Sequence, residues 1–194
     1  MADKLRVMLV DEDPSRTAVL ERALQDNGYD VVARIGTKED LLDRVSTIQP
    51  DVIIIDMQSP DRDTLESMHM INREQPRPVV MFAEKSDKLT IAEAVKAGVS
   101  AYVVDGLNAN RIQPIMEVAI ARFQEYQGLK NELARTKSDL ADRKLIDKAK
   151  GIIMSQRKCA EDDAYKALRK LAMDRNEKLV EVAKSVIEVA KLFG

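Results

Sequence analysis

The chain has 194 residues, a formal net charge of −2 and a single cysteine, Cys159. It contains no apolar run of about 18 residues and no charged-then-apolar leader, which argues against a transmembrane or secreted protein and favours a cytoplasmic one. One cysteine also excludes an internal disulfide.

Charge is divided unevenly along the sequence. Residues 1–142 carry 25 acidic and 18 basic side chains, whereas residues 143–194 carry 8 acidic and 13 basic side chains. An acidic protein therefore ends in a basic segment, which favours a negatively charged partner such as RNA for that segment.

Apolar strands alternate with amphipathic helices over residues 1–120. Strands are expected at 5–10, 31–35, 51–56, 78–83 and 101–104, and helices at 14–27, 37–48, 62–74 and 86–97. Because the strands are apolar without interruption, they indicate a parallel sheet that is buried on both faces. The sequence thus predicts an α/β domain over residues 1–120.

Acidic residues follow two of these strands. Asp11, Glu12 and Asp13 come at the end of the first strand, and Asp56 comes at the end of the third. Ligands bind at the carboxyl ends of parallel strands, and carboxylate oxygens suit Mg²⁺. The sequence predicts a Mg²⁺ pocket in which a carboxylate can accept a phosphoryl group. The alternative is an acidic patch without a function.

The segments VDED, IIIDMQSP, VVMFAE and AYVVDG, in this order, resemble the receiver domain of two-component response regulators. The resemblance implies a flavodoxin-like, five-stranded parallel fold. It also implies that Asp56 is the phosphoacceptor equivalent and that Asp11, Glu12, Asp56 and Gln58 hold the metal.

Two landmarks of receiver domains are missing. Ala83 stands where a hydroxyl residue is expected, and Asp105, followed by Gly106, stands where a lysine is expected. In such domains the lysine neutralises phosphoryl oxygens and the hydroxyl moves toward them, so Asp105 reverses a needed charge. We therefore hypothesise that phosphotransfer does not switch this domain; a phosphorylation-activated response regulator is the alternative.

The strand followed by Asp11, Glu12 and Asp13 also satisfies the start of the motif of haloacid-dehalogenase-like phosphohydrolases. Such an enzyme needs a later lysine for the phosphate, and the fifth strand is followed by Asp105 and Gly106 instead. This enzyme is the most distant alternative, and we expect no catalytic residues.

One long helix is expected from Asn108 to Lys150, and residues 121–142 are expected to form a coiled-coil linker between two domains. Its apolar seam consists of Tyr126, Leu129, Leu133 and Leu140. Thr136 and Arg143 are polar interruptions in the same seam. This pattern predicts a modest, specific homodimer; the alternative is a rod that docks on its own receiver domain.

Three apolar stripes at helical spacing follow in residues 143–194 and predict a C-terminal three-helix bundle. Glu161, Asp162 and Asp163 mark the start of the second helix, where negative charge suits the exposed N–H groups. Asn176 is a plausible N-cap for the third helix. The stripes are Leu145, Ile146, Ala149, Ile152 and Ile153; Ala164, Ala167, Leu168 and Leu171; and Leu179, Val182, Ala183, Val186 and Ile187.

The segments AKGIIM and AYKALRKLAM, with flanking arginines and a following N..L..VA, look like the ANTAR domain of transcriptional antiterminators. The resemblance covers nearly all of residues 143–190. It implies an RNA-binding module that holds paired hairpins in leader mRNA, and no DNA target. Ala160 departs from the pattern, because such domains often carry a small hydroxyl residue before the acidic helix start.

RNA binding needs cationic groups for phosphate and groups that stack on loop bases or bond to their edges. Arg143, Lys150 and Arg157 are seven residues apart and share one stripe of a continuous helix. The second helix offers Tyr165, Arg169 and Lys170, although core packing is the favoured interpretation for Tyr165. The alternative for each charge is that it only solvates the helix.

The degenerate receiver, the stretch DMQSPDRDTLE and the coiled coil together look most like NasT-type nitrate-assimilation antiterminators. This resemblance implies control of nitrate and nitrite assimilation genes. It also implies a cytoplasmic nitrate- or nitrite-binding sensor protein that holds the regulator inactive until the ligand binds.

Overall fold

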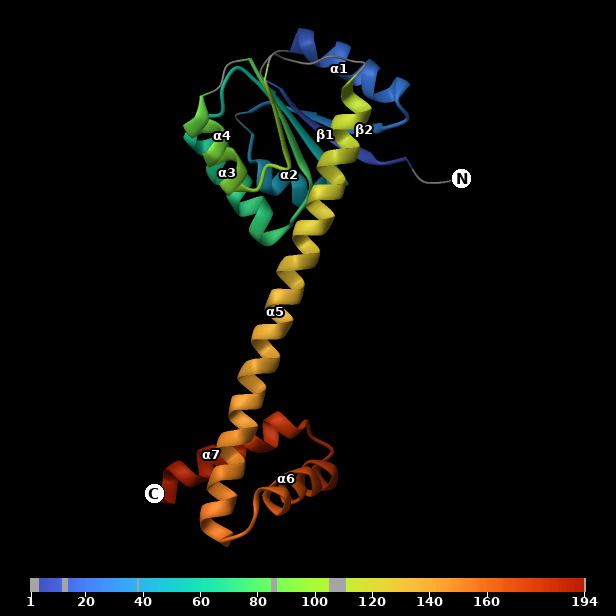
Figure 1. Cartoon of the computed structure of the whole chain (residues 1–194). Helices are drawn as coiled ribbons and strands as arrows, with labels where there is room; N and C mark the ends of the chain where they lie inside the picture. The colour runs from blue at the N-terminus through green and yellow to red at the C-terminus, as the bar shows by residue number, and fades with distance from the viewer. Residues whose placement is uncertain (1–3, 12–13, 38, 85–86, 105–110, 194) are drawn as a thin grey trace. The chain divides into compact units, whose positions relative to one another are not determined.

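The computed structural model describes residues 4–11, 14–37, 39–84, 87–104 and 111–193 (Figure 1). Two compact units make up the chain, Met1–Gln127 and Gly128–Gly194. The domain limits expected from the sequence, residues 120 and 142, both lie within helix α5 (Ile112–Arg157), and the division between the two units falls between them.

The first unit contains a five-stranded parallel sheet with the order β2-β1-β3-β4-β5. This arrangement confirms the predicted flavodoxin-like fold, and each strand lies within two residues of its expected position. The strands are β1 (Arg6–Asp11), β2 (Asp30–Ile35), β3 (Val52–Met57), β4 (Val79–Ala83) and β5 (Ala101–Val104).

Helices cover both faces of this sheet, as Figure 1 shows. The helices α2 (Leu41–Ile48), α3 (Arg62–Glu74) and α4 (Lys88–Ala97) pack on one face, against side chains such as Met8 and Ile53. The opposite face, with Leu9 and Ile54, is covered by α1 (Pro14–Asp26) and by the start of α5 (Ile112–Arg157). Neighbouring residues of a strand point to opposite faces, so a continuous apolar strand fills both cores.

Short polar side chains begin three of these helices. Asp40, Asp61 and Asp87 are N-caps whose carboxylates accept hydrogen bonds from backbone N–H groups in the first turn. Hydrogen bonds from the side chain and then from the backbone N–H of Thr64 lower the pKa of Asp61, and the backbone bonds to Asp87 lower the pKa of Asp87. At the other end of α4, Gly98 has φ 105°, and an added Cβ would lie 2.5 Å from the Asn72 side chain. Glycine is therefore required at this C-cap for two separate reasons.

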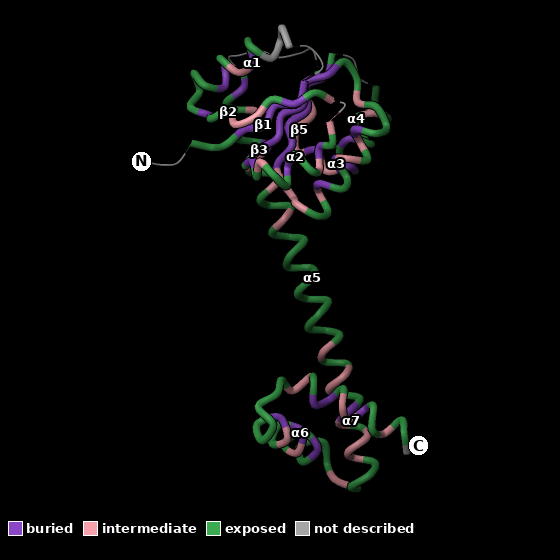
Figure 2. The backbone as a smooth tube through the Cα atoms, turned by 180° about the vertical axis from the view of Figure 1, so that it is seen from behind, coloured by how far each residue is buried: buried purple, intermediate pink, exposed green. Residues whose placement is uncertain are grey.

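Helix α5 (Ile112–Arg157) is continuous over 46 residues. Its first turns bury Ile112, Met116 and Ala119 against the sheet. The prediction of one long helix is confirmed from Ile112 to Lys150, and the helix runs on to Arg157; its expected start at Asn108 lies outside the described residues. Residues 128–141 are all exposed, which is visible as a green stretch of α5 in Figure 2.

The second unit is a three-helix bundle of the last turns of α5 with α6 (Glu161–Arg175) and α7 (Leu179–Phe193). Its core is small. It contains the predicted stripe residues Leu145, Ile146, Ala149, Ile152, Ile153, Leu168, Leu171, Leu179, Val182, Ala183, Val186 and Ile187, together with Ala172. All three predicted stripes therefore contribute to one core, although Ala164 is buried outside this cluster and Ala167 is half-buried.

The caps of the bundle differ from expectation at one position. Asn176 was expected to be the N-cap of α7, and this prediction was wrong: Asn176 is the C-cap of α6, with φ 52°. Asparagine tolerates this left-handed conformation better than most residues, so the same residue type can serve either role. Ala160 is the N-cap of α6 and provides no side-chain hydrogen bond, as its sequence predicted.

Among the helices that the structure describes, none is both long enough and apolar enough to cross a bilayer.

Candidate nucleic-acid interface and acidic pocket

Two carboxylates lie side by side at the carboxyl end of the sheet in the first unit. Asp11 ends β1, Asp56 lies near the end of β3, and the two residues are partners in the register of these neighbouring strands. Both are buried, with exposed fractions of 9% and 3%. Parallel strands bring their carboxyl ends to one edge, so Asp11 and Asp56 lie together there.

This pair offers the hard oxygen ligands that Mg²⁺ requires. Gln58 follows β3 and is exposed, whereas Glu12 lies outside the described residues. Within the described ranges, no three carboxylate, histidine or cysteine side chains form a metal-binding group. Asp11 and Asp56 therefore fit Mg²⁺ by donor chemistry.

The neighbouring strand lacks a hydroxyl group. Ala83 ends β4, is the register partner of Met57 and is fully buried. A buried methyl group can donate no hydrogen bond to an oxygen anion on Asp56. Asp105, the second departure, lies outside the described residues.

In the second unit, the three basic residues expected along α5 differ in their surroundings. Arg143 and Arg157 are exposed. Lys150 is held by two carboxylates: its Nζ lies 2.7 Å from Asp147 Oδ1 and 2.6 Å from Glu161 Oε1. These hydrogen bonds raise the pKa of Lys150. Lys150 therefore links α5 to the first turn of α6, and its charge is offset within the protein.

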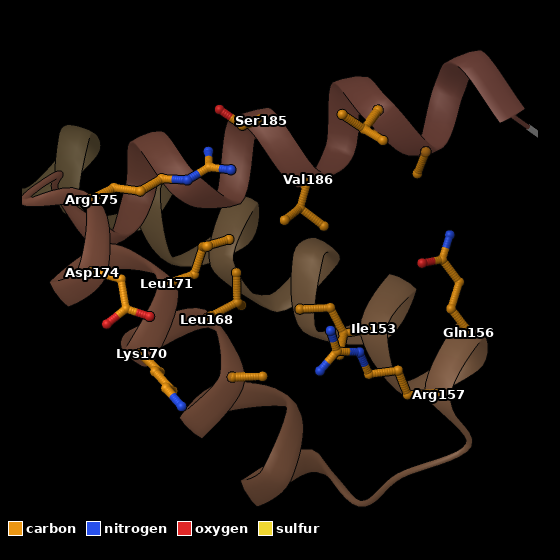
Figure 3. A pocket seen from close by; sticks show the side chains of 13 residues that line it. Ile153, Gln156, Arg157, Leu168, Lys170, Leu171, Asp174, Arg175, Ser185 and Val186 are labelled. Carbon is orange, nitrogen blue, oxygen red and sulfur yellow. The ribbon is translucent and has the colours of Figure 1, made fainter.

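A groove of about 440 Å³ is lined by the end of α5 and by α6 and α7 (Figure 3). Arg157 stands on its α5 side, and Lys170 and Arg175 stand on its α6 side. Apolar side chains form the floor: Ile153, Leu168, Leu171, Val186 and Val189.

Tyr165 and Arg169 lie on the other flank of α6. They line a cleft of about 510 Å³ together with Met173, Asn176 and Lys178. Tyr165 is 42% exposed and Met173 is 72% exposed, so the interpretation of Tyr165 as a core residue was wrong. Positions 165, 169 and 173 are four residues apart and form one stripe along the helix surface. We call Tyr165, Arg169 and Met173 the α6 stripe.

The cations of these two flanks differ in their pairing from three lysines of the bundle. Lys150, Lys166 and Lys184 each pair with a carboxylate. Within the described ranges, Arg157, Arg169, Lys170 and Arg175 take part in no ion pair. An unpaired, exposed guanidinium is available for a phosphate or for the face of a base.

The structure therefore divides the predicted RNA-binding residues between two flanks. Arg157 and Lys170 border the groove, Tyr165 and Arg169 belong to the α6 stripe, and Lys150 lies in an ion-pair network. Sequence reasoning missed Met173, Arg175 and Lys178. The spacing of Met173 from Tyr165 and Arg169 was a usable signal, but only burial separates an exposed methionine from a core one.

Two family models match the chain. The response regulator receiver domain matches residues 7–117, and the ANTAR domain matches residues 134–187.

Curated relatives match over different lengths. The transcriptional regulatory protein PdtaR of Mycobacterium tuberculosis is 29% identical over 183 residues, which cover 94% of this chain and 89% of the relative. A nitrate regulatory protein of Klebsiella oxytoca is 44% identical over 69 residues, which cover 36% of this chain and 17% of that protein.

Solved structures match the receiver fold. The signal receiver domain of a modulated diguanylate cyclase from Desulfovibrio desulfuricans superposes with a TM-score of 0.56 at 20% identity, covering 64% of this chain and 99% of that one. The receiver domain of a response regulator NarL from Mycobacterium tuberculosis gives 0.54 at 19% identity, with coverages of 60% and 97%. At these identities the likeness concerns the fold alone.

Proposed function

The chain belongs to the response regulators with a receiver domain and a C-terminal ANTAR domain, and from this premise we propose that it is an RNA-binding transcriptional antiterminator. It binds paired hairpins in leader mRNA and keeps a downstream terminator from forming. The function requires binding, not catalysis.

The α6 stripe carries this proposal. An exposed aromatic ring, an unpaired guanidinium and an exposed thioether lie along one face of a helix in a basic unit. Loop bases of RNA are splayed out and stack on aromatic rings and guanidinium planes. Tyr165 and Arg169 provide these two surfaces, and Met173 extends the apolar contact.

The groove on the other flank supplies phosphate contacts in this proposal. Arg157, Lys170 and Arg175 surround it, while Asp174 is an acidic residue of the same lining. Each phosphate that a cation neutralises releases a counterion, so binding through this flank weakens as salt rises. Arg143 adds a further exposed cation on α5. Lys150 contributes by holding α6 in place and reaches RNA only if its ion pairs open.

The first test compares variants for binding to a leader RNA with two short hairpins. Tyr165→Ala removes one stacking surface, a loss of about 1–3 kcal/mol, which corresponds to roughly 5- to 150-fold weaker binding. Arg169→Ala weakens binding and reduces the slope of affinity against salt by about one. Lys184→Ala is the matched control, because Lys184 is an exposed cation that pairs with Glu181 on α7.

Scrambled RNA and duplex DNA serve as competitors, with and without a small-molecule phosphodonor. Hairpin-dependent binding that ignores the phosphodonor supports the proposal and agrees with Ala83 at the end of β4. Hairpin binding that appears only with the phosphodonor would contradict the proposed signal and would indicate that phosphorylation of Asp56 activates the protein. Equal affinity for all three nucleic acids contradicts an RNA-specific reader.

Because Ala83 replaces the hydroxyl residue of the receiver domain, the regulatory signal in this proposal is a sensor protein and not phosphorylation of Asp56. We propose that a cytoplasmic nitrate- or nitrite-binding sensor holds the chain away from RNA and releases it when the ligand binds. The matching nitrate regulatory protein of Klebsiella oxytoca supports this input, over 36% of the chain. Asp11, Asp56 and Gln58, with Glu12, are the residues that would hold Mg²⁺, whose charge would stabilise the carboxylates of the pocket.

A further inference from the structure

A pocket of about 450 Å³ in the first unit is lined mainly by residues of α4, β5 and α5. This volume is within the range of about 300–1,000 Å³ that is typical of sites for small molecules. The pocket differs from the acidic pair at the carboxyl end of the sheet, because none of the described residues that line it carries a carboxylate. We call it the aromatic pocket.

Aromatic side chains are concentrated in this pocket. The chain has four tyrosines, three phenylalanines and no tryptophan. Tyr102 of β5, with Phe123 and Tyr126 of α5, line the aromatic pocket. Ile91 and Val95 of α4 add apolar side chains, and Val95 and Tyr126 are 58% and 56% exposed. The pocket thus offers an apolar surface, accessible to solvent, that suits a planar ring.

Two hydroxyl groups of the pocket are available as hydrogen-bond donors. The hydroxyl of Tyr102 is buried and has no hydrogen-bond partner among the described residues. Because a buried polar group without a partner costs free energy, an acceptor on a ligand would stabilise it. The hydroxyl oxygen of Ser100 accepts a hydrogen bond from the backbone N–H of Val79 at 3.3 Å, which leaves the hydroxyl proton of Ser100 available for a second bond.

Two cations line the same pocket. Lys96 of α4 and Arg122 of α5 are both exposed there. Over the part of the chain that the structure describes, neither side chain takes part in an ion pair. Aromatic rings can also hold a cation, but these two positive charges would repel one. The charges of the pocket therefore favour an anion.

We propose that the aromatic pocket binds a small, planar organic anion. The ring of this ligand lies against Tyr102, Phe123 and Tyr126, and its carboxylate or phosphate oxygens accept hydrogen bonds from Arg122 and Lys96. The hydroxyl of Tyr102 donates to the same ligand. This site goes beyond the proposed function, because its residues belong to the first unit and none of them is proposed to contact RNA.

The first test is calorimetric titration of the full-length chain with two planar anions, naphthoate and adenosine monophosphate. They carry a carboxylate and a phosphate, so the titrations distinguish the two sources of negative charge. At least one of them is expected to bind. Its neutral counterpart, naphthamide or adenosine, is expected to bind at least about tenfold more weakly, because charge-assisted hydrogen bonds are lost. No binding of either anion, or equal binding of an anion and its neutral counterpart, overturns the proposal.

Two substitutions test the residues of the pocket. Arg122→Gln removes one positive charge, and Tyr102→Phe removes only the buried hydroxyl. Each is expected to weaken binding of the anion by roughly tenfold. Arg135→Gln is the matched control, because Arg135 is an exposed cation of α5 outside the pocket and its loss should leave the affinity unchanged. Wild-type affinity in either pocket variant overturns the proposal.

Adenosine monophosphate also suits the α6 stripe, so its titration is repeated with Arg169→Ala. Nucleotide binding that is lost in this variant and kept in Arg122→Gln places the nucleotide on the α6 stripe and contradicts the aromatic pocket as its site.

Methyl NMR of the unsubstituted chain locates the ligand even if a pocket variant fails to fold. The ring current of a bound naphthoate or adenine is expected to shift the methyl signals of Ile91 and Val95, whereas those of Val186 and Val189 in the second unit stay unchanged. Shifts confined to the second unit overturn the proposal. Because no RNA is present, a chain that binds the anion but ignores hairpin RNA contradicts only the proposed function.

Discussion

Lys150 joins two helices at the corner between α5 and α6. Its Nζ donates to Asp147 in its own helix and to Glu161 in the first turn of α6. The hydrogen bond from Lys150 is the largest cause of the lowered pKa of Asp147. An alignment of charges along one stripe of α5 cannot reveal this, because Glu161 reaches Lys150 only after the chain has turned.

Replacing Lys150 by Met, which keeps the apolar stem, is expected to lower the urea midpoint of the bundle at neutral pH. A lowered folded-state pKa of Asp147 means that its stabilisation is present above the unfolded-state pKa of about 3.9 and is lost as pH falls through the lower folded-state pKa. The raised pKa of Lys150 implies stabilisation that persists until pH rises through its folded value. The difference in urea midpoint between wild type and Lys150→Met is therefore expected to become smaller as pH falls toward 3.

Urea unfolding at pH 7 and pH 3 measures this difference in midpoint. Lys184→Met is the control, because the partner of Lys184, Glu181, lies within the same helix. The same difference in urea midpoint at both pH values contradicts a stabilising role of the ion pairs of Lys150. A fully stable Lys150→Met that loses hairpin binding would instead make Lys150 an RNA contact.

At the scale of elements, the start of α6 is the weakest local feature. Three acidic residues, Glu161, Asp162 and Asp163, suit the N-terminal end of the helix dipole, yet Ala160 leaves the cap without a side-chain acceptor. The extended backbone of Ala160, with φ −70° and ψ 162°, already has the geometry of a capping residue.

Ala160→Ser is expected to raise the free energy of unfolding of the bundle by about 0.5–2 kcal/mol, because the hydroxyl accepts a hydrogen bond from the first turn. RNA affinity is expected to stay unchanged, since position 160 belongs to neither flank of α6 that is proposed to contact RNA. Chemical denaturation and hairpin titration measure the two quantities, and Ala160→Gly is a control that should shift stability less than serine does. A serine variant no more stable than wild type contradicts the cap assignment.

Helix α5 contributes buried side chains to both units. It buries Ile112 and Met116 in the first unit, exposes its leucines in the middle and buries Ala149 in the second unit. One element thus contributes to the receiver core, carries an exposed apolar seam and forms part of the C-terminal bundle.

At the scale of the whole molecule, sequestration by a sensor predicts a dependence on the coiled coil. Deleting residues 129–142 removes two heptads and rejoins the helix close to its original phase. We expect the deleted chain to lose binding to a purified nitrate-binding sensor, measured by pull-down with and without nitrate. Full-length Arg169→Ala is the control and should bind the sensor normally. Unchanged sensor binding by the deleted chain counts against sequestration through this segment.

The sequence by itself determined the strands, the parallel sheet, the long helix and the three apolar stripes, because each depends on a local period of apolar residues. It also placed Asp11 beside Asp56, since parallel strands end at one edge. The tertiary structure alone decided which side chains stay exposed and which charges are paired: Tyr165 is exposed, Lys150 is engaged with Glu161, and Asn176 ends α6. These properties depend on contacts between helices, and no local period encodes them.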